Sequence, residues 1–213
     1  MTASADAEAI AGLYACGWLL VHESLAELVG LAPTVSVALE HAQAAGGIVE
    51  AAGRARAVLG ARADDLTGHT RQAFASVQQH TPAATWPEAL LKNHLIVGMG
   101  LDLSTRTHAT WPEQVSVALA GGPGRDLAAQ VQASITGLDL DETTASRTAL
   151  FGRRVIAELS AQAQRIAGRD TALARALTGA EAGSADEISH TVELIQDLVE
   201  GAAQRMLALG LQP

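Results

Sequence analysis

Residues 6–29 read DAEAIAGLYACGWLLVHESLAELV, and their apolar positions recur at intervals of three and four residues. This spacing places the apolar side chains on one side of a helix and predicts a continuous packing stripe. The stripe consists of Ile10, Leu13, Tyr14, Gly17, Leu20, Val21, Leu25 and Leu28. Gly30 and Pro33 are expected to end the helix, because glycine favours helix ends and proline cannot continue a helix.

The rest of the chain continues the helical pattern. Ala is the commonest residue, and the chain is also rich in Leu, Glu, Gln and Arg, all of which lose little side-chain freedom in a helix. No run alternates apolar and polar residues as a strand would. Helices are expected over residues 6–29, 34–59, 64–79, 141–167, 171–177 and 184–209, with two more beginning near residues 85 and 110. The chain is therefore predicted to be one all-α domain over residues 1–213, an up-and-down bundle with added short helices.

The sequence ATWPE occurs twice, at residues 84–88 and 109–113. In each copy the threonine can cap the free N–H groups of a helix, the proline suits the first turn, and the glutamate can reach back. Both copies therefore predict a helix start. The following segment, Gly121-Gly122-Pro123-Gly124, predicts a break in the helical pattern, and it lacks the lysine and the preceding strand of a phosphate-binding loop.

The packing faces of two long helices can also be located. Gly46 and Gly47 lie in the middle of the helix 34–59, where two glycines cost about 2 kcal/mol relative to alanine. We expect another helix to approach closely there. In the helix 141–167 the predicted buried face consists of Leu150, Val155, Ile156, Leu159, Ala163 and Ile166.

Composition argues against several classes of partner. The net charge is −9, Lys92 is the only lysine, and aromatic residues make up 3% of the chain. Nucleic acid binding relies on Lys and Arg to neutralise phosphates and on aromatic rings to stack on bases, so a nucleic acid partner is not expected. The apolar N-terminal stretch is interrupted by Glu8, His22 and Glu23, so a membrane span is not expected either.

The single cysteine, Cys16, allows no intrachain disulfide and suits a reducing compartment. It is expected to be a small buried residue rather than a nucleophile, because its nearest basic neighbour in sequence is only His22. The N-terminus has no basic region of the kind that begins a signal peptide. A cytoplasmic location is therefore expected.

Helical bundles hold metal ions with carboxylates and histidines that project into the core, often as Glu-x-x-His. The spacing occurs once here, at Glu187 and His190. Glu187 is also the third residue of a capping box that begins at Ser184, and capping is the favoured interpretation. The other histidines, including His22 and His41 beside Glu23 and Glu40, do not form a ligand pair, because adjacent helical residues point about 100° apart.

Several stretches together carry a resemblance to a known family. They are residues 15–33, residues 86–92, residues 150–165 and the ending 205–211. In these stretches the chain resembles the ferritin-like proteins of the tRNA isopentenyladenosine hydroxylase-like group. The resemblance covers most of the chain, is strongest in residues 153–165 and is weakest between residues 108 and 141. It implies a ferritin-like bundle and, in the catalytic relatives, a non-haem di-iron centre that activates oxygen.

The ligand positions of those relatives are occupied differently in this chain. The resemblance places Trp18 at the glutamate of the first helix, and Gly46 and Val49 at the Glu-x-x-His of the second. The corresponding part of the fourth helix is 97–101, with Asp102 as the nearest carboxylate, and the last ligand set falls at 121–124. Since Trp, Gly and Val cannot bind iron, no metal cofactor is expected. Trp18 is instead expected to fill the vacated space, with its ring against the Gly46-Gly47 notch.

Three functions are compatible with these observations. The favoured one is a metal-free, non-catalytic structural or interaction protein that forms a dimer with itself or with a related ferritin-like protein. The second is a non-haem di-iron or other metal-dependent oxygenase of the tRNA-modifying type, with the candidate ligands Glu23, Asp102, Glu187 and His190. The third is a small-molecule binding module with an apolar cavity near Trp18, Val49 and Val97.

Overall fold

The computed structural model describes residues 4–181 and 183–213, and within these ranges all regular secondary structure is helical. The long helices are α1 (Ala5–Gly30), α2 (Val35–Leu59), α3 (Ala63–His80), α4 (Trp86–Thr107), α7 (Glu142–Ala167) and α9 (Ala185–Ala208). The shorter helices are α5 (Glu113–Leu119), α6 (Gly124–Thr136) and α8 (Thr171–Thr178), with 3₁₀ turns at Gly60–Arg62 and His108–Thr110. The all-α prediction is confirmed, and the predicted bounds of the long helices agree with the observed ones to within about one residue.

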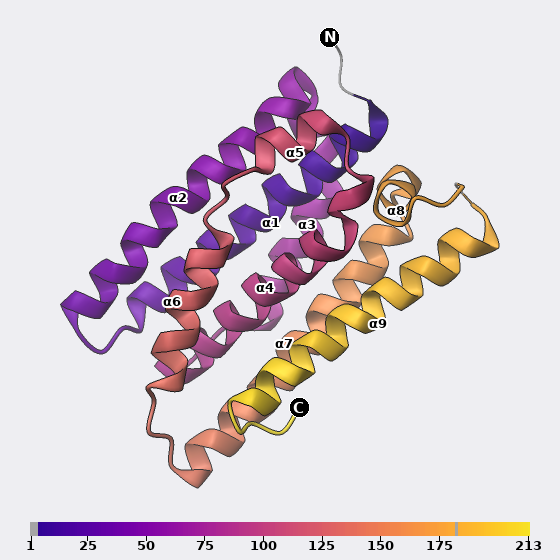
Figure 1. The fold of residues 1–213 in the computed structure, drawn as a ribbon. Coiled ribbons are helices and arrows are strands. Elements are labelled where there is room, and N and C mark those ends of the chain that lie inside the picture. Colours follow the sequence, from indigo (N-terminus) through magenta and orange to yellow (C-terminus); the bar gives the residue numbers. More distant parts are fainter. Residues whose placement is uncertain (1–3, 182) are drawn as a thin grey trace.

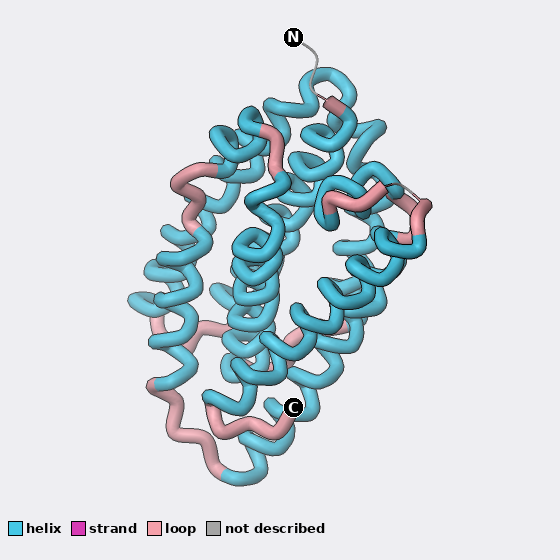
Figure 2. The backbone as a smooth tube through the Cα atoms, turned by 45° about the vertical axis from the view of Figure 1, so that its right-hand side comes forward, coloured by secondary structure: helices cyan, strands magenta, loops and turns pink. Residues whose placement is uncertain are grey.

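Helices α1, α3, α4 and α7 form the centre of the bundle. Helix α1 packs against α3 and α4, and α7 packs against the same two helices from the other side. Around this centre, α2 lies along α1, α9 lies along α4 and α7, and α6 lies along α4 (Figure 1). Helix α8 packs against α1 and α9 near one end of the bundle. Most connecting loops lie toward the two ends (Figure 2), as expected of an up-and-down bundle.

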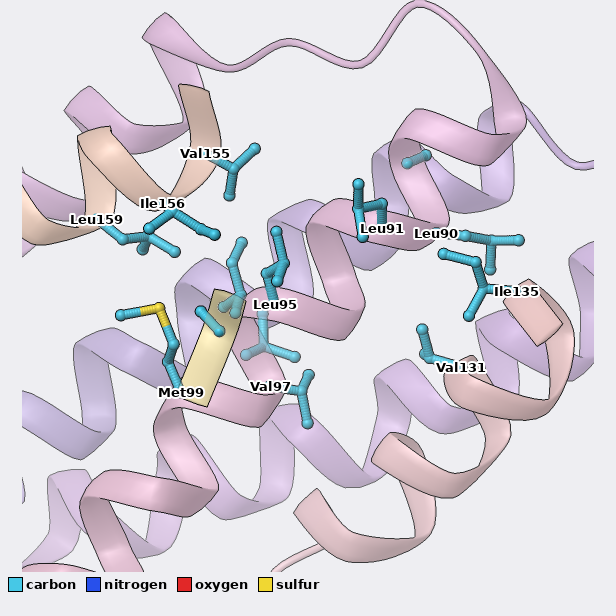
Figure 3. Close-up of a cluster of buried hydrophobic side chains, with 14 of the residues drawn as sticks. Leu90, Leu91, Leu95, Val97, Met99, Val131, Ile135, Val155, Ile156 and Leu159 are labelled. Carbon is cyan, nitrogen blue, oxygen red and sulfur yellow. The ribbon is translucent and has the colours of Figure 1, made fainter. Parts of the chain in front are cut away.

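Helix α4 supplies the centre of the hydrophobic core. All its residues from 88 to 99 are buried, as expected of a helix surrounded by other helices. Figure 3 shows Leu95 of α4 between Val155 of α7 on one side and Val131 of α6 on the other. Fully burying such a side chain stabilises the fold by about 1.5–3 kcal/mol. The core therefore fixes the position of α4 between α6 and α7.

One charged side chain lies inside this core. Lys92 is fully buried, and its ammonium group donates hydrogen bonds to the Glu27 carboxylate, the Gln78 side-chain oxygen and the Thr81 carbonyl. Burial lowers the pKa of Lys92, and the hydrogen bond to Glu27 opposes this shift. All three ammonium donors have acceptors, which is the condition under which a buried charge is tolerated. Lys92 therefore joins α1, the end of α3 and α4.

The helix starts follow local capping chemistry. In α1, α2, α7, α8 and α9 the side chain of the N-cap residue accepts a hydrogen bond from a backbone N–H of the first turn. These N-cap residues are Ser4, Thr34, Asp141, Asp170 and Ser184. The starts of α2, α7 and α9 are thus the ones predicted from the sequence. The Gly121–Gly124 break is also confirmed, since α5 ends before it and α6 begins at Gly124.

Both ATWPE copies mark a helix start, but the predicted threonine cap is found at neither. Thr85 accepts no capping hydrogen bond, and the second helix begins three residues after Thr110. The first copy begins α4, with Glu88 accepting a hydrogen bond from the N–H of Ala84. In the second copy Thr110 lies in a 3₁₀ turn, and α5 begins only at Glu113. The Thr110 hydroxyl donates to the carbonyl of Ala176 in α8 at 2.8 Å, a contact that residues 109–113 alone could not indicate.

Two predicted packing faces need correction. Gly47 is approached by Pro123 of the α5–α6 turn, 3.6 Å from the Cβ position, rather than by a helix. No described heavy atom lies within 4 Å of the Cβ position of Gly46, so its place in α2 is not explained by packing. Leu150, expected on the buried face of α7, is 63% exposed. It is two residues from the buried Gly152, which turns it by about 200° to the opposite side of the helix.

Helix α1 is long and apolar enough to cross a membrane by length and composition, and half of its most apolar window is buried. Core helices of soluble bundles pass the same test. In this structure α1 packs against α2, α3, α4 and α8, which is the position of a core helix.

Candidate functional site

A cavity of about 710 Å³ lies between α1, the C-terminal half of α4, the α5–α6 turn and helices α7 to α9. Small residues help to create the space, because Gly17 of α1 and Gly100 of α4 both line it. Gly100 is exposed although it directly follows the fully buried part of α4. A Cβ built on Gly100 would meet no heavy atom of the described residues within 4 Å. The cavity volume lies within the range of about 300–1,000 Å³ that is usual for small-molecule sites.

Trp18 forms part of the cavity wall, but not in the predicted manner. Its indole ring lies against the α5–α6 turn, with Cη2 3.0 Å from the Cβ position of Gly124 and Cζ2 3.6 Å from that of Gly122. The expected contact with the Gly46-Gly47 notch is therefore wrong, since the glycines that receive the ring are in the turn. Glycine is needed at 124, because a methyl group there would press on the ring. Trp18 is partly buried and lines the cavity without filling it.

Tyr14 and Trp111 form an aromatic part of the wall. Their ring centroids are 5.0 Å apart in an edge-to-face arrangement, a favourable geometry for aromatic pairs. The Trp111 indole N–H donates to the Thr107 hydroxyl at 3.0 Å, which fixes the orientation of the ring. Burial raises the pKa of Tyr14, and the nearby Ser104 hydroxyl opposes the shift. Tyr14 is therefore a neutral phenol at physiological pH.

Two buried polar atoms on the cavity lining have no hydrogen-bond partner among the described residues. They are the Thr191 hydroxyl oxygen and the Tyr14 hydroxyl oxygen, which has the Ser104 hydroxyl nearby but not in hydrogen-bonding geometry. Leaving such a group unsatisfied costs about 1–3 kcal/mol. Solvent does not reach either oxygen, so the two hydroxyls lie within the wall and do not face the open space.

Exposed residues mark the rim of the cavity. Thr105, His108 and Arg125 all line it and are exposed to solvent. The His108 ring is held by a 2.9 Å contact between its Nδ1 atom and the Thr105 carbonyl. The α5–α6 turn brings Arg125 to this rim, since Arg125 is the second residue of α6. A mostly apolar interior with a polar rim is typical of a ligand pocket.

Two of the candidate metal ligands lie in ion pairs with arginine. Both oxygens of the Asp102 carboxylate accept hydrogen bonds from the Arg205 guanidinium, at 2.6 and 2.7 Å. Glu23 accepts hydrogen bonds from Arg71 in the same bidentate way. Bidentate arginine pairs are strong, and a metal ion would have to displace the arginine from each carboxylate.

The Glu187–His190 pair is not arranged as a metal site. Glu187 is buried and accepts a hydrogen bond from the backbone N–H of Gly183, while its own N–H donates to the Ser184 hydroxyl. His190 is exposed. Within residues 4–181 and 183–213 no group of three or more His, Cys, Asp or Glu side chains converges. The donor set present in this part of the chain therefore does not fit the di-iron centre that the ferritin-like fold implies.

Cys16 is buried and lies at the α1–α3 contact rather than in an electropositive pocket. Burial raises the pKa of its thiol to about 11, although the charge of Arg71 and a hydrogen bond between the thiol and Thr67 oppose the shift. The thiolate form, which is the nucleophile, is therefore scarce at neutral pH.

Three of the four stretches that the resemblance places at metal-ligand positions meet around the cavity. Trp18, Val97 with Leu101, and residues 121–124 of the turn all contribute to its lining, apart from Pro123. The fourth stretch does not, because Gly46 and Val49 face outward from α2 and Val49 is 47% exposed. Sequence reasoning did not find Tyr14, Arg125 or Thr191 as site residues. Their signal is weak, because each looks like an ordinary helix residue until the cavity is seen.

The arrangement of α1, α3, α4 and α7 with an apolar interior defines a helical-bundle protein of the ferritin type. The family model described as "Ferritin-like domain, actinomycetes" matches residues 4–180, and the chain belongs to this family. No curated protein matches the chain. The ferritin-like part of the resemblance is therefore confirmed, whereas membership of the tRNA isopentenyladenosine hydroxylase-like group stays a prediction.

Proposed function

We propose that this protein is a non-catalytic ferritin-like bundle that binds an apolar small molecule in the cavity between α1 and α4. The observation that carries the proposal is the cavity itself, about 710 Å³ of space with mainly apolar walls. Part of the lining, including Gly100, His108 and Arg125, is exposed, so the cavity is open to molecules in solution. An apolar pocket of this size is typical of small-molecule sites.

The polar groups of the cavity support binding rather than catalysis. The Tyr14 and Thr191 hydroxyl oxygens lie within the wall, where solvent does not reach them. Neither is paired with a histidine or a carboxylate that would activate it, and Tyr14 is held in its neutral form. A few placed polar atoms in an apolar wall are the usual composition of a binding pocket.

The oxygenase alternative has less support from the described residues. Its candidate ligands Glu23 and Asp102 are in arginine ion pairs, Glu187 caps α9, and His190 is exposed. The side chains at the corresponding positions of the cavity, such as Trp18 and Val97, have no donor atom suited to iron.

The proposal is tested with N-phenyl-1-naphthylamine, a neutral apolar probe that fluoresces strongly in apolar surroundings. We expect saturable binding with one site per chain, and energy transfer from Trp18 and Trp111, which both line the cavity. Gly100→Leu should abolish most of this binding, because its side chain grows into the open space beside α4. The same change should raise the free energy of unfolding by about 0.5–1 kcal/mol, because leucine is the better helix former.

Gly68→Leu is the matched control. Gly68 is also a helical glycine with no described heavy atom within 4 Å of its Cβ position, but it is exposed on α3 and does not line the cavity. This variant should gain similar stability and keep full probe binding. Unchanged probe affinity in Gly100→Leu would show that the probe binds elsewhere and would overturn the proposal.

A role as an interaction protein is a second candidate, favoured by the outer face of α2. Val35, Leu39 and Val49 on this face are 76%, 57% and 47% exposed. With Ala42, Gly46 and Gly53 they recur at intervals of three and four residues, which is the spacing of a helix-packing seam. A second copy of the chain, packed through α2, is the partner that we propose for this face.

A further inference from the structure

The lining of the cavity has an unusual charge composition for this protein. The chain contains 23 acidic and 14 basic residues, counting Lys and Arg, and has a net charge of −9. Yet none of the described residues that line the cavity is an aspartate or a glutamate. The lining includes one arginine, Arg125, and one histidine, His108. The cavity is therefore free of carboxylates inside an acidic protein.

Arg125 is placed to receive a negatively charged group at the rim. Its side chain lines the cavity while remaining exposed, and it forms no ion pair with any described residue. The adjacent Asp126 is exposed and is not part of the lining. An arginine that is not committed to a carboxylate of its own chain can bind a carboxylate or phosphate of a ligand in bidentate fashion.

The backbone around Arg125 also favours a negatively charged group. Gly122 and Gly124 line the cavity next to Arg125, and Gly124 is the first residue of α6. No side chain of the described residues caps the start of α6, because its N-cap position is held by Pro123. The N-terminal end of a helix carries partial positive charge and favours anions. The attraction of the helix end for an anion therefore adds to that of the Arg125 guanidinium at the rim of the cavity.

Beyond this rim the walls are apolar. The apolar lining includes Trp18, Leu101 and, on α9, Leu194 and Leu198. A molecule bound here has apolar surroundings over most of its surface and a cationic group at the rim. That combination matches a chain-like amphiphile rather than a compact polar metabolite.

We infer that the cavity binds an anionic amphiphile, such as a long-chain carboxylate, with its apolar chain inside the cavity and its acidic head group at Arg125. This inference rests on the proposed function. It goes further in naming the chemical class of the ligand and the residue that selects it.

The experiment measures how well dodecanoate and 1-dodecanol displace N-phenyl-1-naphthylamine from the full chain. The two molecules have the same chain length and differ in the charge of the head group. Dodecanoate should displace the probe more effectively than 1-dodecanol. Arg125→Gln should weaken the affinity for dodecanoate by about fivefold, because ion pairs that are partly exposed to solvent contribute about this much. The affinity for 1-dodecanol should be unchanged. Arg125→Lys keeps the charge and should retain a substantial part of the dodecanoate affinity.

The matched control is Arg56→Gln. Arg56 is an exposed arginine of α2 that does not line the cavity, and its replacement changes the net charge equally. It should affect neither ligand. If dodecanoate and 1-dodecanol bind alike and Arg125→Gln changes neither, the head-group inference is overturned while the cavity proposal stands. If the wild-type chain binds neither the probe nor either amphiphile, the proposed function itself fails.

Discussion

At the scale of single residues, a buried polar group is tolerated in the described structure where it has hydrogen-bond partners, and it lowers the stability of the fold where it has none. Lys92 has three acceptors for its three ammonium donors. His41 is equally buried, but its Nδ1 atom has no hydrogen-bond partner among the described residues. Its Nε2 atom lies 3.4 Å from the Ser134 hydroxyl, and its ring packs edge-to-face against Trp86. A protonated His41 would place a charge in this apolar contact between α2, α4 and α6.

We therefore expect protonation of His41 to contribute to the pH dependence of the free energy of unfolding. Burial lowers the pKa of His41, with Glu40 opposing the shift, and burial with the nearby Arg205 lowers the pKa of His94. A histidine whose pKa is lower in the folded state binds fewer protons there than in the unfolded chain. The free energy of unfolding should fall as pH drops below about 6.5, with a slope of up to about 1.4 kcal/mol per pH unit for each histidine.

Urea unfolding between pH 5 and pH 8 measures this slope. His41→Gln should flatten the pH profile, because glutamine does not titrate. His69→Gln serves as the control, since His69 is exposed on α3, and it should leave the profile unchanged. Parallel profiles for wild type and His41→Gln would mean that His41 does not contribute to the acid sensitivity.

At the scale of the helices, close approach depends on a few glycines. A Cβ at Gly152 of α7 would lie 2.7 Å from Leu91 Cδ2 and 2.9 Å from the Met206 side chain. These contacts are too short for real side chains, so α7 can approach α4 and α9 only because residue 152 is glycine. Gly152 belongs to the stretch 150–165 that carries part of the family resemblance, and its packing gives a physical reason for glycine there.

Gly152→Ala should destabilise the protein by about 1–3 kcal/mol, the usual effect of overpacking a core. Helix propensity alone predicts the opposite sign, because alanine is favoured over glycine in a helix by about 0.5–1 kcal/mol. Gly68→Ala tests that opposite effect at an open position of α3 and should be stabilising. Thermal and urea unfolding of both variants measure the two signs, and a stabilised Gly152→Ala would contradict the close packing of α7.

The helices were predictable from the sequence because their signals are local. Ser184 with Glu187, and the Gly121–Gly124 segment, act within a few residues of the helix ends that they set. The second ATWPE copy also precedes a helix, but Thr110 is not its cap, because Thr110 lies in a 3₁₀ turn and contacts Ala176, which is distant in sequence. The cavity was only partly predictable. Trp18 and Val97 were expected near the cavity. Whether Gly17 and Gly100 line the same cavity depends on how α1 packs against α4, which the sequence alone does not specify.

At the scale of the whole molecule, the bundle has one apolar region turned inward and another turned outward. The inward one is the cavity, and the outward one is the α2 face that contains Val35, Leu39 and Val49. Helix α2 packs mainly against α1, with lesser contacts to α5 and α3, and has its other side free of described elements (Figure 1). Exposed apolar residues scattered singly need no explanation, but a row along one helix face indicates an interaction surface.

If two copies pair through this face, the wild-type protein should sediment as a dimer at micromolar concentration. Leu39→Glu together with Val49→Glu should convert it to a monomer of 21.9 kDa, because two carboxylates would be buried at each side of the seam. Leu150→Glu places a charge at a residue that is 63% exposed on α7, and it should leave the dimer intact. Probe binding should survive in all three proteins, because neither site lies in the cavity. If the wild-type protein still sediments as a monomer at a concentration 100-fold above this micromolar range, pairing through α2 is ruled out. The ligand proposal would be unaffected, since the α2 face and the cavity lie on different sides of α1.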